Sequence, residues 1–390
     1  MTDQAQDRHR LVSGAAALVP LLREHAAETD RVAALPDSVV KVLHESGFFA
    51  LQAPSSLGGP EADFRTAFEV YTELARGCGS TAWVAMILSG GSFFASLLGE
   101  QAREEVWGTD IGAGVCSQLV STGTARAADG GLVVSGRWAT VSGAHQASWA
   151  LVAVSDNTGE SAGGDTSLAL VPMSAVSVES TWNVVGLRAT RSDTVVIDEV
   201  FVPEHRLISL GKMIQGGYGA DHPEEPLYGA PVITALGLTL AAPLLGLGRA
   251  ALEYAVDVLR VETPGAAAKP TGRAGTAYVQ FAVADASTLI DTATMHIHRA
   301  LDDVQRSIET RTQPDSMTQA RVHMDAATAA ASIGEAVRLL LTAVGTRAFA
   351  LDNPLQRIWR DVEVASRHAM ISLGANRESF GQALLGLDAD

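Results

Sequence analysis

Cysteine is scarce in this sequence: only Cys78 and Cys116 occur in 390 residues, and they lie far apart. Metal sites built from cysteine and histidine need closely spaced ligands, and the sequence has no His-Glu-x-x-His motif and no Cys/His cluster. We therefore expect no metal site. Two isolated thiols also fit a reduced protein of the cytoplasm.

Basic residues are few as well. The chain has 28 Lys and Arg against 44 Asp and Glu, and its formal net charge is −16. Phosphate backbones bind to net basic surfaces, so nucleic acid is not expected as a partner. The polar N-terminal residues contain no signal-peptide core.

Long hydrophobic runs are also missing. The longest, residues 230–247, is interrupted by prolines, glycines and threonines, whereas a membrane span needs about 20 residues of sustained apolarity. Residues 246–251 have a GxGxxA shape, but they lie in a long helical pattern with no strand before them. They are therefore no dinucleotide-binding fingerprint, and we do not expect the chain to take hydride from NAD(P)H itself.

Apolar residues, by contrast, are abundant. They make up 47% of the chain, and charged residues make up 18%, so the chain can bury a large core and is not disordered. A length of 390 residues suits two or three subdomains better than one small core.

Hydrophobic periodicity divides the chain into three parts. Residues 1–112 read as helices; for example, Phe64, Phe68 and Tyr71 recur at helical spacing. Residues 113–225 read as a small β-domain, and residues 226–390 as a helical bundle. The predicted strands are 132–138, 148–154, 168–171, 176–179 and 194–197, and the predicted bundle helices are 234–259, 279–308, 317–344 and 355–386. The predicted fold class is thus α+β and mostly α.

The last of these segments has the most specific pattern. Residues 353–361 read Asn-Pro-Leu-Gln-Arg-Ile-Trp-Arg-Asp, and His368 and Ala369 follow shortly after. The stretch resembles the C-terminal helix of the acyl-CoA dehydrogenase superfamily, where an Arg-Asp pair precedes the active-site segment. That superfamily also has an N-terminal helical domain, a central β-domain and a C-terminal four-helix bundle, so the resemblance covers nearly the whole chain.

The residues after Asp361 point to one branch of the superfamily. The resemblance places a dehydrogenase's catalytic Glu eight residues after the Asp, where this chain has Ala369. A His seven residues after the Asp, as His368 is, resembles the flavin-dependent monooxygenase branch. A lone His on a partly apolar helix can also be structural. As an imidazole in a dry pocket, however, His368 could set the protonation state of oxygen activated on a reduced flavin.

The resemblance implies further flavin contacts. Trp138 and Thr140 belong to a strand that would lie against the flavin, and Ser142 matches a Ser near the reactive edge of its ring. The alternative for Ser142 is an ordinary hairpin turn.

A second group of residues would hold the other end of the cofactor. Arg260 and Gln280 resemble an Arg and a Gln that bind the diphosphate and adenosine side across a subunit interface, which implies a homotetramer. Gly345 matches a Gly turn that admits the adenosine, or is a plain helix C-cap.

The substrate side departs from the pattern of the phenol hydroxylases in this branch. They have a His about eight residues after the Trp of a Gly-Ser-Thr-Ala-Trp block, and here that block ends at Trp83 and the matching residue is Gly91. This absence favours a nitrososynthase-like enzyme, which oxidises the amine of a nucleotide-linked amino sugar. Arg321 is a candidate cation for such a substrate.

The sequence therefore predicts the oxygenase component of a two-component flavin monooxygenase. A separate flavin reductase would supply reduced FAD or FMN, and an aromatic or polyketide substrate is the alternative to the amino sugar. Two other interpretations remain open. One is an acyl-CoA dehydrogenase whose base is Glu253 or Asp257, and the other is a scaffold without flavin.

Overall fold

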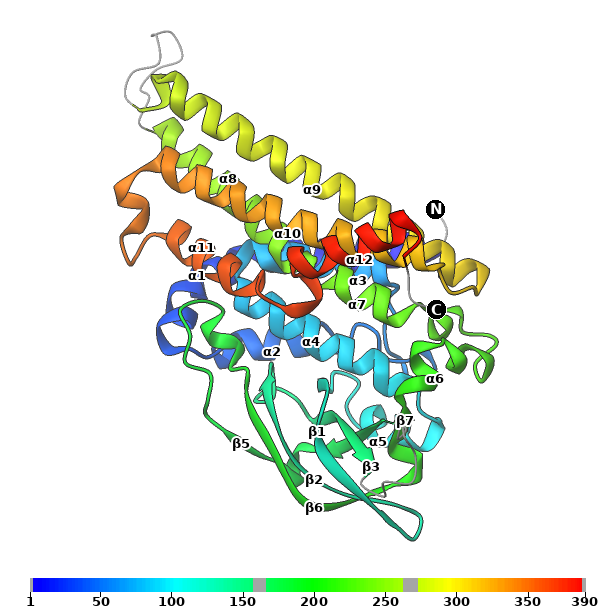
Figure 1. The fold of residues 1–390 in the computed structure, drawn as a ribbon. Coiled ribbons are helices and arrows are strands. Elements are labelled where there is room, and N and C mark those ends of the chain that lie inside the picture. The colour runs from blue at the N-terminus through cyan, green and yellow to red at the C-terminus, as the bar shows by residue number, and fades with distance from the viewer. Residues whose placement is uncertain (1–2, 157–165, 262–272, 388–390) are drawn as a thin grey trace.

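A computed structural model describes residues 3–156, 166–261 and 273–387. Helices from the N-terminal part lie between a β-sheet and a set of long C-terminal helices (Figure 1). The three predicted parts follow one another along the chain as expected, and the helix α4 (Gly79–Ser96) runs where the sheet and the bundle meet.

The N-terminal part consists of five helices. The helix α3 (Phe64–Gly77) begins at Asp63, whose carboxylate accepts the backbone N–H of Thr66 and so satisfies one free amide of the first turn. The predicted helical spacing is confirmed, because Phe64, Phe68 and Tyr71 are all buried. The other helices of this part are α1 (Asp3–Val32), α2 (Asp37–Glu45), α4 and α5 (Glu100–Trp107).

Among the residues that the structure describes, the central part forms one seven-stranded sheet with the strand order β5-β6-β2-β1-β3-β4-β7. Neighbouring strands are antiparallel except for β1 and β3, which are parallel. All five predicted strands are present, but the sequence patterns do not predict β1, whose residues are mostly small or polar. The strands are β1 (Val115–Ala128), β2 (Gly131–Val141), β3 (Trp149–Asp156), β4 (Ser167–Pro172), β5 (Ser177–Glu179), β6 (Asp193–Pro203) and β7 (Leu207–Ser209).

Long helices dominate the C-terminal part, and two of the four predicted segments are divided. The first is divided into α7 and α8 at Leu240, and the last into α11 and α12. The short helix α6 (Leu210–Ile214) still lies within residues 113–225. The helices of the C-terminal part are α7 (Val232–Thr239), α8 (Ala241–Val261), α9 (Ala277–Thr310), α10 (Ser316–Val344), α11 (Pro354–Ala365) and α12 (Leu373–Leu385).

The break between α11 and α12 corrects the prediction that His368 lies within a helix. Its backbone is extended, with φ −60° and ψ 133°, and its Nδ1 accepts the N–H of Met370 at the start of the short turn Ala369–Ile371. A side chain that bonds to the nearby backbone competes with helix continuation. His368 therefore sits at a corner of the chain.

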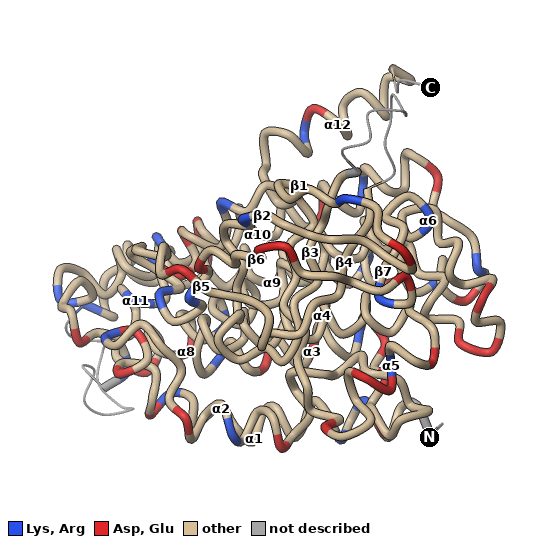
Figure 2. The backbone as a smooth tube through the Cα atoms, turned by 90° about the horizontal axis from the view of Figure 1, so that it is seen from below, with Lys and Arg blue, Asp and Glu red and all other residues tan. Residues whose placement is uncertain are grey.

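Two helical stretches, Val232–Arg260 and Ser316–Val344, are long and apolar enough to span a membrane. In the most apolar window of each, 78% and 61% of the residues are buried inside the fold, which is typical of core helices in a bundle. Figure 2 shows acidic and basic residues scattered along the chain trace.

Candidate functional site

Three residues of the predicted site come together at the meeting point of the three parts. Trp83 lies on α4, Ser142 follows β2, and His368 lies between α11 and α12. The indole Nε1–H of Trp83 donates to Ser142 Oγ at 3.2 Å, and the Trp83 and His368 rings lie 6.2 Å apart between centroids. The structure thus joins residues that are widely separated in sequence.

Ser142 also begins a chain of buried hydroxyl groups. Its Oγ lies 2.7 Å from Ser192 Oγ, which lies 2.9 Å from Thr190 Oγ1. Thr190 Oγ1 in turn lies 2.9 Å from the carbonyl oxygen of Leu187. Ser192 is missing from the sequence-based prediction, because 50 residues separate it from Ser142 and no local pattern signals the contact.

The Arg-Asp pair of α11 anchors the loop that carries these hydroxyl groups. Asp361 is buried and accepts the backbone N–H of Leu187 at 2.6 Å. Burial raises the pKa of Asp361 to about 6, although the Leu187 N–H lowers it in part. Arg360 donates to the carbonyl of Val185 and pairs with Asp30 at 2.7 Å. Arg360 and Asp361 therefore fix the backbone at Val185 and Leu187, next to the hydroxyl chain.

His368 has a defined set of hydrogen-bonding options. Its side chain is exposed at the surface of the single chain, yet the protein around the ring lowers its pKa by desolvation. The neutral form is thus favoured, and its Nδ1 accepts the N–H of Met370 at 3.3 Å. A neutral imidazole that accepts at Nδ1 carries its proton on Nε2. His368 can therefore offer a single N–H donor near Trp83.

The prediction that Trp138 contacts the flavin does not agree with the structure. Its side chain is fully buried, and its Nε1–H donates to the carbonyl of Ala153 at 2.8 Å. The ring occupies the space beside Gly123 and Gly136, where any Cβ would overlap it. Trp138 belongs to the core of the β-domain because small residues make room for it there.

Thr140, in contrast, is exposed and has an unusual backbone. Its φ is +60°, which is rare for a β-branched residue. The pairing of β2 with β6 shifts register between Trp138 and Val141, so the chain bulges outward at Thr140. Gln118 steadies the bulge by donating to the Ala139 carbonyl at 2.8 Å. Strained positions of this kind often accompany ligand sites.

The second predicted group gathers at one end of the bundle. Leu259, Val279 and Ala343 form a small buried cluster there. Their neighbours Arg260, at the end of α8, and Gln280, in the first turns of α9, are exposed at the same end.

Gly345 completes this end of the bundle. Its φ of +82° favours glycine, and a Cβ would overlap the guanidinium of Arg273. Arg273 donates to the carbonyls of Thr342 and Ala343, the two residues that precede Val344 at the end of α10. Arg273 is a second cation in this group, and the sequence-based assignment did not include it.

Gly91 does not face an open space. A Cβ on Gly91 would overlap the carbonyl oxygen of Val115, so β1 packs directly on that side of α4. The space is at Gly90, where a Cβ would meet no atom of the described residues within 4 Å. Gly90 lies seven residues after Trp83, on the same side of the helix. The open space beside α4 is therefore at Gly90 and not at Gly91.

Arg321 is not available as a free cation. Its guanidinium pairs with Asp303 at 2.7 Å, and Asp303 is buried and also pairs with Arg306 at 3.2 Å. The pairing of Arg321 weakens its assignment to a substrate diphosphate.

The alternative dehydrogenase bases are poorly placed. Glu253 pairs with Arg23 at 2.6 Å and with Arg76 at 2.7 Å. Burial raises the pKa of Glu253, but these two cations outweigh it, and the pKa lies below its ordinary value. Asp257 lies on the exposed side of α8. A paired carboxylate of low pKa makes a weak proton acceptor.

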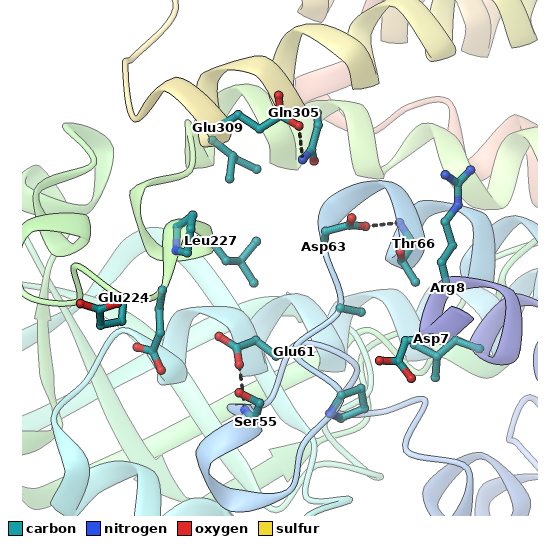
Figure 3. A pocket seen from close by; sticks show the side chains of 16 residues that line it. Asp7, Arg8, Ser55, Glu61, Asp63, Thr66, Glu224, Leu227, Gln305 and Glu309 are labelled. Carbon is teal, nitrogen blue, oxygen red and sulfur yellow. Dashed lines mark hydrogen bonds between the residues drawn. The ribbon is translucent and has the colours of Figure 1, made fainter. Parts of the chain in front are cut away.

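A large cavity lies elsewhere in the molecule. It has a volume of about 720 Å³ and is bordered by α1, the segment before α3, residues 224–227 and the end of α9 (Figure 3). Carboxylates dominate its wall, with Asp7, Glu61, Asp63, Glu224 and Glu309 against the single cation Arg8. Such a wall disfavours a flavin phosphate, and none of the predicted site residues lines it.

The comparisons with known proteins agree with the architecture. Residues 16–113 match the acyl-CoA dehydrogenase N-terminal domain, and residues 238–373 match the acyl-CoA dehydrogenase C-terminal domain. The chain is 32% identical over 361 residues to the flavin-dependent monooxygenase oxygenase subunit HsaA of Rhodococcus jostii (strain RHA1), covering 90% of this chain and 92% of that protein. It is also 32% identical to the FADH(2)-dependent resorcinol hydroxylase oxygenase component of Rhizobium sp. (strain MTP-10005). That match covers 99% of this chain and 96% of the hydroxylase component.

A solved structure gives the same result. XiaF from Streptomyces sp., in complex with FADH2 and glycerol, aligns with a TM-score of 0.92 at 32% identity and covers 99% of this chain and 98% of that chain. The chain belongs to the acyl-CoA dehydrogenase superfamily, in its flavin-dependent monooxygenase branch. The predicted family and fold class are confirmed.

The residues of this monooxygenase chain fit a flavin at both groups. Trp83, Ser142 and His368 offer uncharged hydrogen-bonding groups, as a flavin ring requires. Arg260 and Arg273 offer cations at the other group, as a phosphate requires. Within the described residues, no group of three His, Cys, Asp or Glu is placed to hold a metal ion.

Proposed function

We propose that this chain is the oxygenase component that uses reduced FAD or FMN and O₂ to hydroxylate an aromatic substrate. The observation that carries the proposal is the meeting of Trp83, Ser142 and His368 at one point. At this point the chain has Ala369 where a dehydrogenase would have its carboxylate. When bound, reduced flavin supplies the electrons that activate O₂.

The chain's own residues have distinct proposed roles. His368 presents Nε2–H toward the reacting oxygen and can donate a hydrogen bond to it. Ser142 contacts the reactive edge of the flavin ring, and Trp83 holds Ser142 in place. Trp83, Ser142 and the hydroxyl groups that follow it are buried, so their hydrogen bonds act in a medium of low polarity, whereas His368 is exposed in the single chain.

The bundle end would bind the phosphate side of the cofactor from a neighbouring subunit. Arg260 and Gln280 are exposed in the single chain. The apolar residues Tyr278 and Phe281, beside Gln280 in sequence, are exposed too, and so is Phe349, four residues after Gly345. An exposed apolar group of this kind is typical of a protein interface. We propose a second copy of the chain as the partner, in a homotetramer.

An aromatic substrate suits the space beside Trp83. Gly90 leaves that side of α4 open, and Ile87, between the two, is partly buried and apolar. Several similar proteins are named for the hydroxylation of aromatic compounds, resorcinol among them. The pairing of Arg321 with Asp303 does not favour the predicted amino sugar, whose diphosphate would need a free cation.

A product assay tests this function. The protein is supplied with O₂, with FAD or FMN, and with a flavin reductase plus NADH, and is offered a panel of phenols and nucleotide-linked amino sugars. We expect a mass gain of one oxygen atom on a phenol. Oxidation of a sugar amine alone would replace the aromatic assignment with the nitrososynthase-like one. No oxidised product from any compound, with reduced flavin bound, would remove the oxygenase assignment.

A further inference from the structure

The hydrogen bonds that link Ser142, Ser192 and Thr190 all run in one donor-to-acceptor direction. The last acceptor, the carbonyl oxygen of Leu187, determines this direction. Each hydroxyl group has one proton to donate and two lone pairs that accept. The carbonyl oxygen of Leu187 can only accept, and it lies 2.9 Å from Thr190 Oγ1. Thr190 must therefore donate its only hydroxyl proton to Leu187, because two facing lone pairs would repel each other.

The other three bonds then follow in order. Since Thr190 has used its proton, the 2.9 Å contact with Ser192 requires Ser192 to donate. Since Ser192 has used its proton, the 2.7 Å contact with Ser142 requires Ser142 to donate. Trp83 can only donate, and it donates to Ser142 at 3.2 Å. All the protons point the same way, from Trp83 toward Leu187.

This direction leaves Ser142 with a restricted role. Its proton is committed to Ser192, and one of its lone pairs accepts from Trp83. What Ser142 can offer to a ligand is one lone pair and no proton. All four side chains are buried, with exposed fractions of 0–7%, so solvent does not readily reorient them. Asp361 also fixes the Leu187 peptide from the other side.

We propose that Ser192 and Thr190 set, through Ser142, how strongly the site prefers reduced over oxidised flavin. Reduction of a flavin turns a ring nitrogen at the reactive edge from an acceptor into an N–H donor. The open lone pair of Ser142 would accept that N–H, whereas it would face the lone pair of the oxidised ring. Ser192 and Thr190 are thus positioning residues that act through Ser142. The inference rests on the proposed function, in which Ser142 contacts the flavin.

Such selectivity suits an enzyme that receives its flavin from another protein. Reduced flavin would be taken from a solution that also contains oxidised flavin. Once the flavin is oxidised again, the same lone pair would favour its release. The selectivity therefore concerns binding alone and can be measured without turnover.

The test compares dissociation constants for oxidised and for chemically reduced flavin under anaerobic conditions. We expect the wild type to bind reduced flavin at least about tenfold more tightly. Ser192→Ala and Thr190→Val each free the Ser142 proton to turn toward the ligand, and each should lower the ratio roughly three- to tenfold. The midpoint potential of the bound flavin reports the same ratio, at about 30 mV per tenfold change.

Two controls separate this effect from a general loss of structure. Thr190→Ser keeps the hydroxyl group and should keep the wild-type ratio. Ser155→Ala removes one partner of a separate hydroxyl pair within the sheet, since Ser155 Oγ lies 2.6 Å from Ser121 Oγ. It should also leave the ratio unchanged.

The outcomes distinguish the inference from the function on which it rests. A ratio that falls in Ser192→Ala and Thr190→Val but not in the controls supports the inference. If either of those variants binds flavin with the wild-type ratio, the inference is wrong while the proposed function stands. If the wild type binds flavin in neither redox state, the proposed function fails first.

Discussion

The two groups of predicted cofactor residues differ in how complete each is within one chain. Trp83, Ser142 and His368 lie close together on separate parts of the chain, and a buried hydroxyl chain backs Ser142. Arg260 and Gln280 lie exposed at the end of the bundle. One group is assembled by the fold of a single subunit, and the other presents its side chains outward.

This difference indicates two roles. The buried hydrogen bonds of the first group suit the chemical step, and the exposed cations of the second suit cofactor binding. A group that must direct a proton benefits from burial, because desolvated hydrogen bonds are strong and keep their direction. A group that binds phosphate benefits from exposed cations with freedom to meet the ligand. We therefore expect substitutions in the first group to change the fate of oxygen and those in the second to change affinity.

The largest effect is expected for His368→Ala. Loss of a positioned acid–base group lowers rates by about 10²-fold or more, so product formation should fall by about that factor while oxygen use continues as peroxide release. Oxygen uptake, peroxide and product are measured together. Arg367→Ala is the control, because Arg367 is exposed and pairs only with Glu363 at 2.9 Å among the described residues. Unchanged coupling in His368→Ala would return His368 to a structural role.

Two adjacent glycines of α4, Gly90 and Gly91, provide a second comparison close to Trp83. Gly91→Ala places a Cβ against the Val115 carbonyl and should lower the free energy of unfolding by about 1–3 kcal/mol. Gly90→Ala enters open space and should be neutral, or stabilising by up to about 1 kcal/mol from helix propensity. Urea unfolding of both variants measures the difference. Equal stability of the two variants would show that β1 does not pack on Gly91.

The bundle end is tested by Arg260→Ala. Loss of one cation at a phosphate should weaken flavin binding about tenfold, close to 1.4 kcal/mol, without changing the ratio of product to oxygen consumed. Titration of reduced flavin measures this affinity. Arg31→Ala, at the exposed end of α1, is the matched control. A change in coupling with unchanged affinity would contradict the division between the two groups.

The smallest effect concerns the pH dependence of stability. Burial raises the pKa of Asp361 to about 6, so the folded protein binds this proton more tightly than the unfolded chain. Lowering the pH from 7 to 5 should therefore stabilise the fold at this residue by about 1 kcal/mol. Asp361→Asn keeps an oxygen acceptor for Leu187 and removes the titration. Unfolding at both pH values should show that increment in the wild type and not in the variant.

The sequence predicts the fold well where periodicity is strong. The β2 and β6 segments are rich in β-branched residues, and the helix α10 buries residues at helical spacing from Val322 to Val344. The strand β1 escapes prediction because small polar residues such as Ser121, Thr122 and Gly123 leave little hydrophobic signal. The break at His368 escapes because a single side-chain bond to Met370 decides it.

The site is predicted only in part for a similar reason. The resemblance brought together Trp83, Ser142 and His368, which the fold places side by side. It did not show that Trp138 points into the core, since that depends on Gly123 and Gly136 across the strand. Contacts between distant segments follow from tertiary packing, which local sequence patterns do not encode.

The central claim is that the group assembled within one chain transfers oxygen from O₂ to a substrate. Its most direct test is to run the reaction under ¹⁸O₂ with reduced flavin, a hydroxylatable phenol and catalase to remove free peroxide. The account predicts one ¹⁸O atom in each product molecule, and about 10²-fold less of this product when His368 is replaced by Ala at matched flavin occupancy. Product oxygen that comes from water, or bleaching of oxidised flavin by an acyl-CoA thioester without O₂, would contradict it.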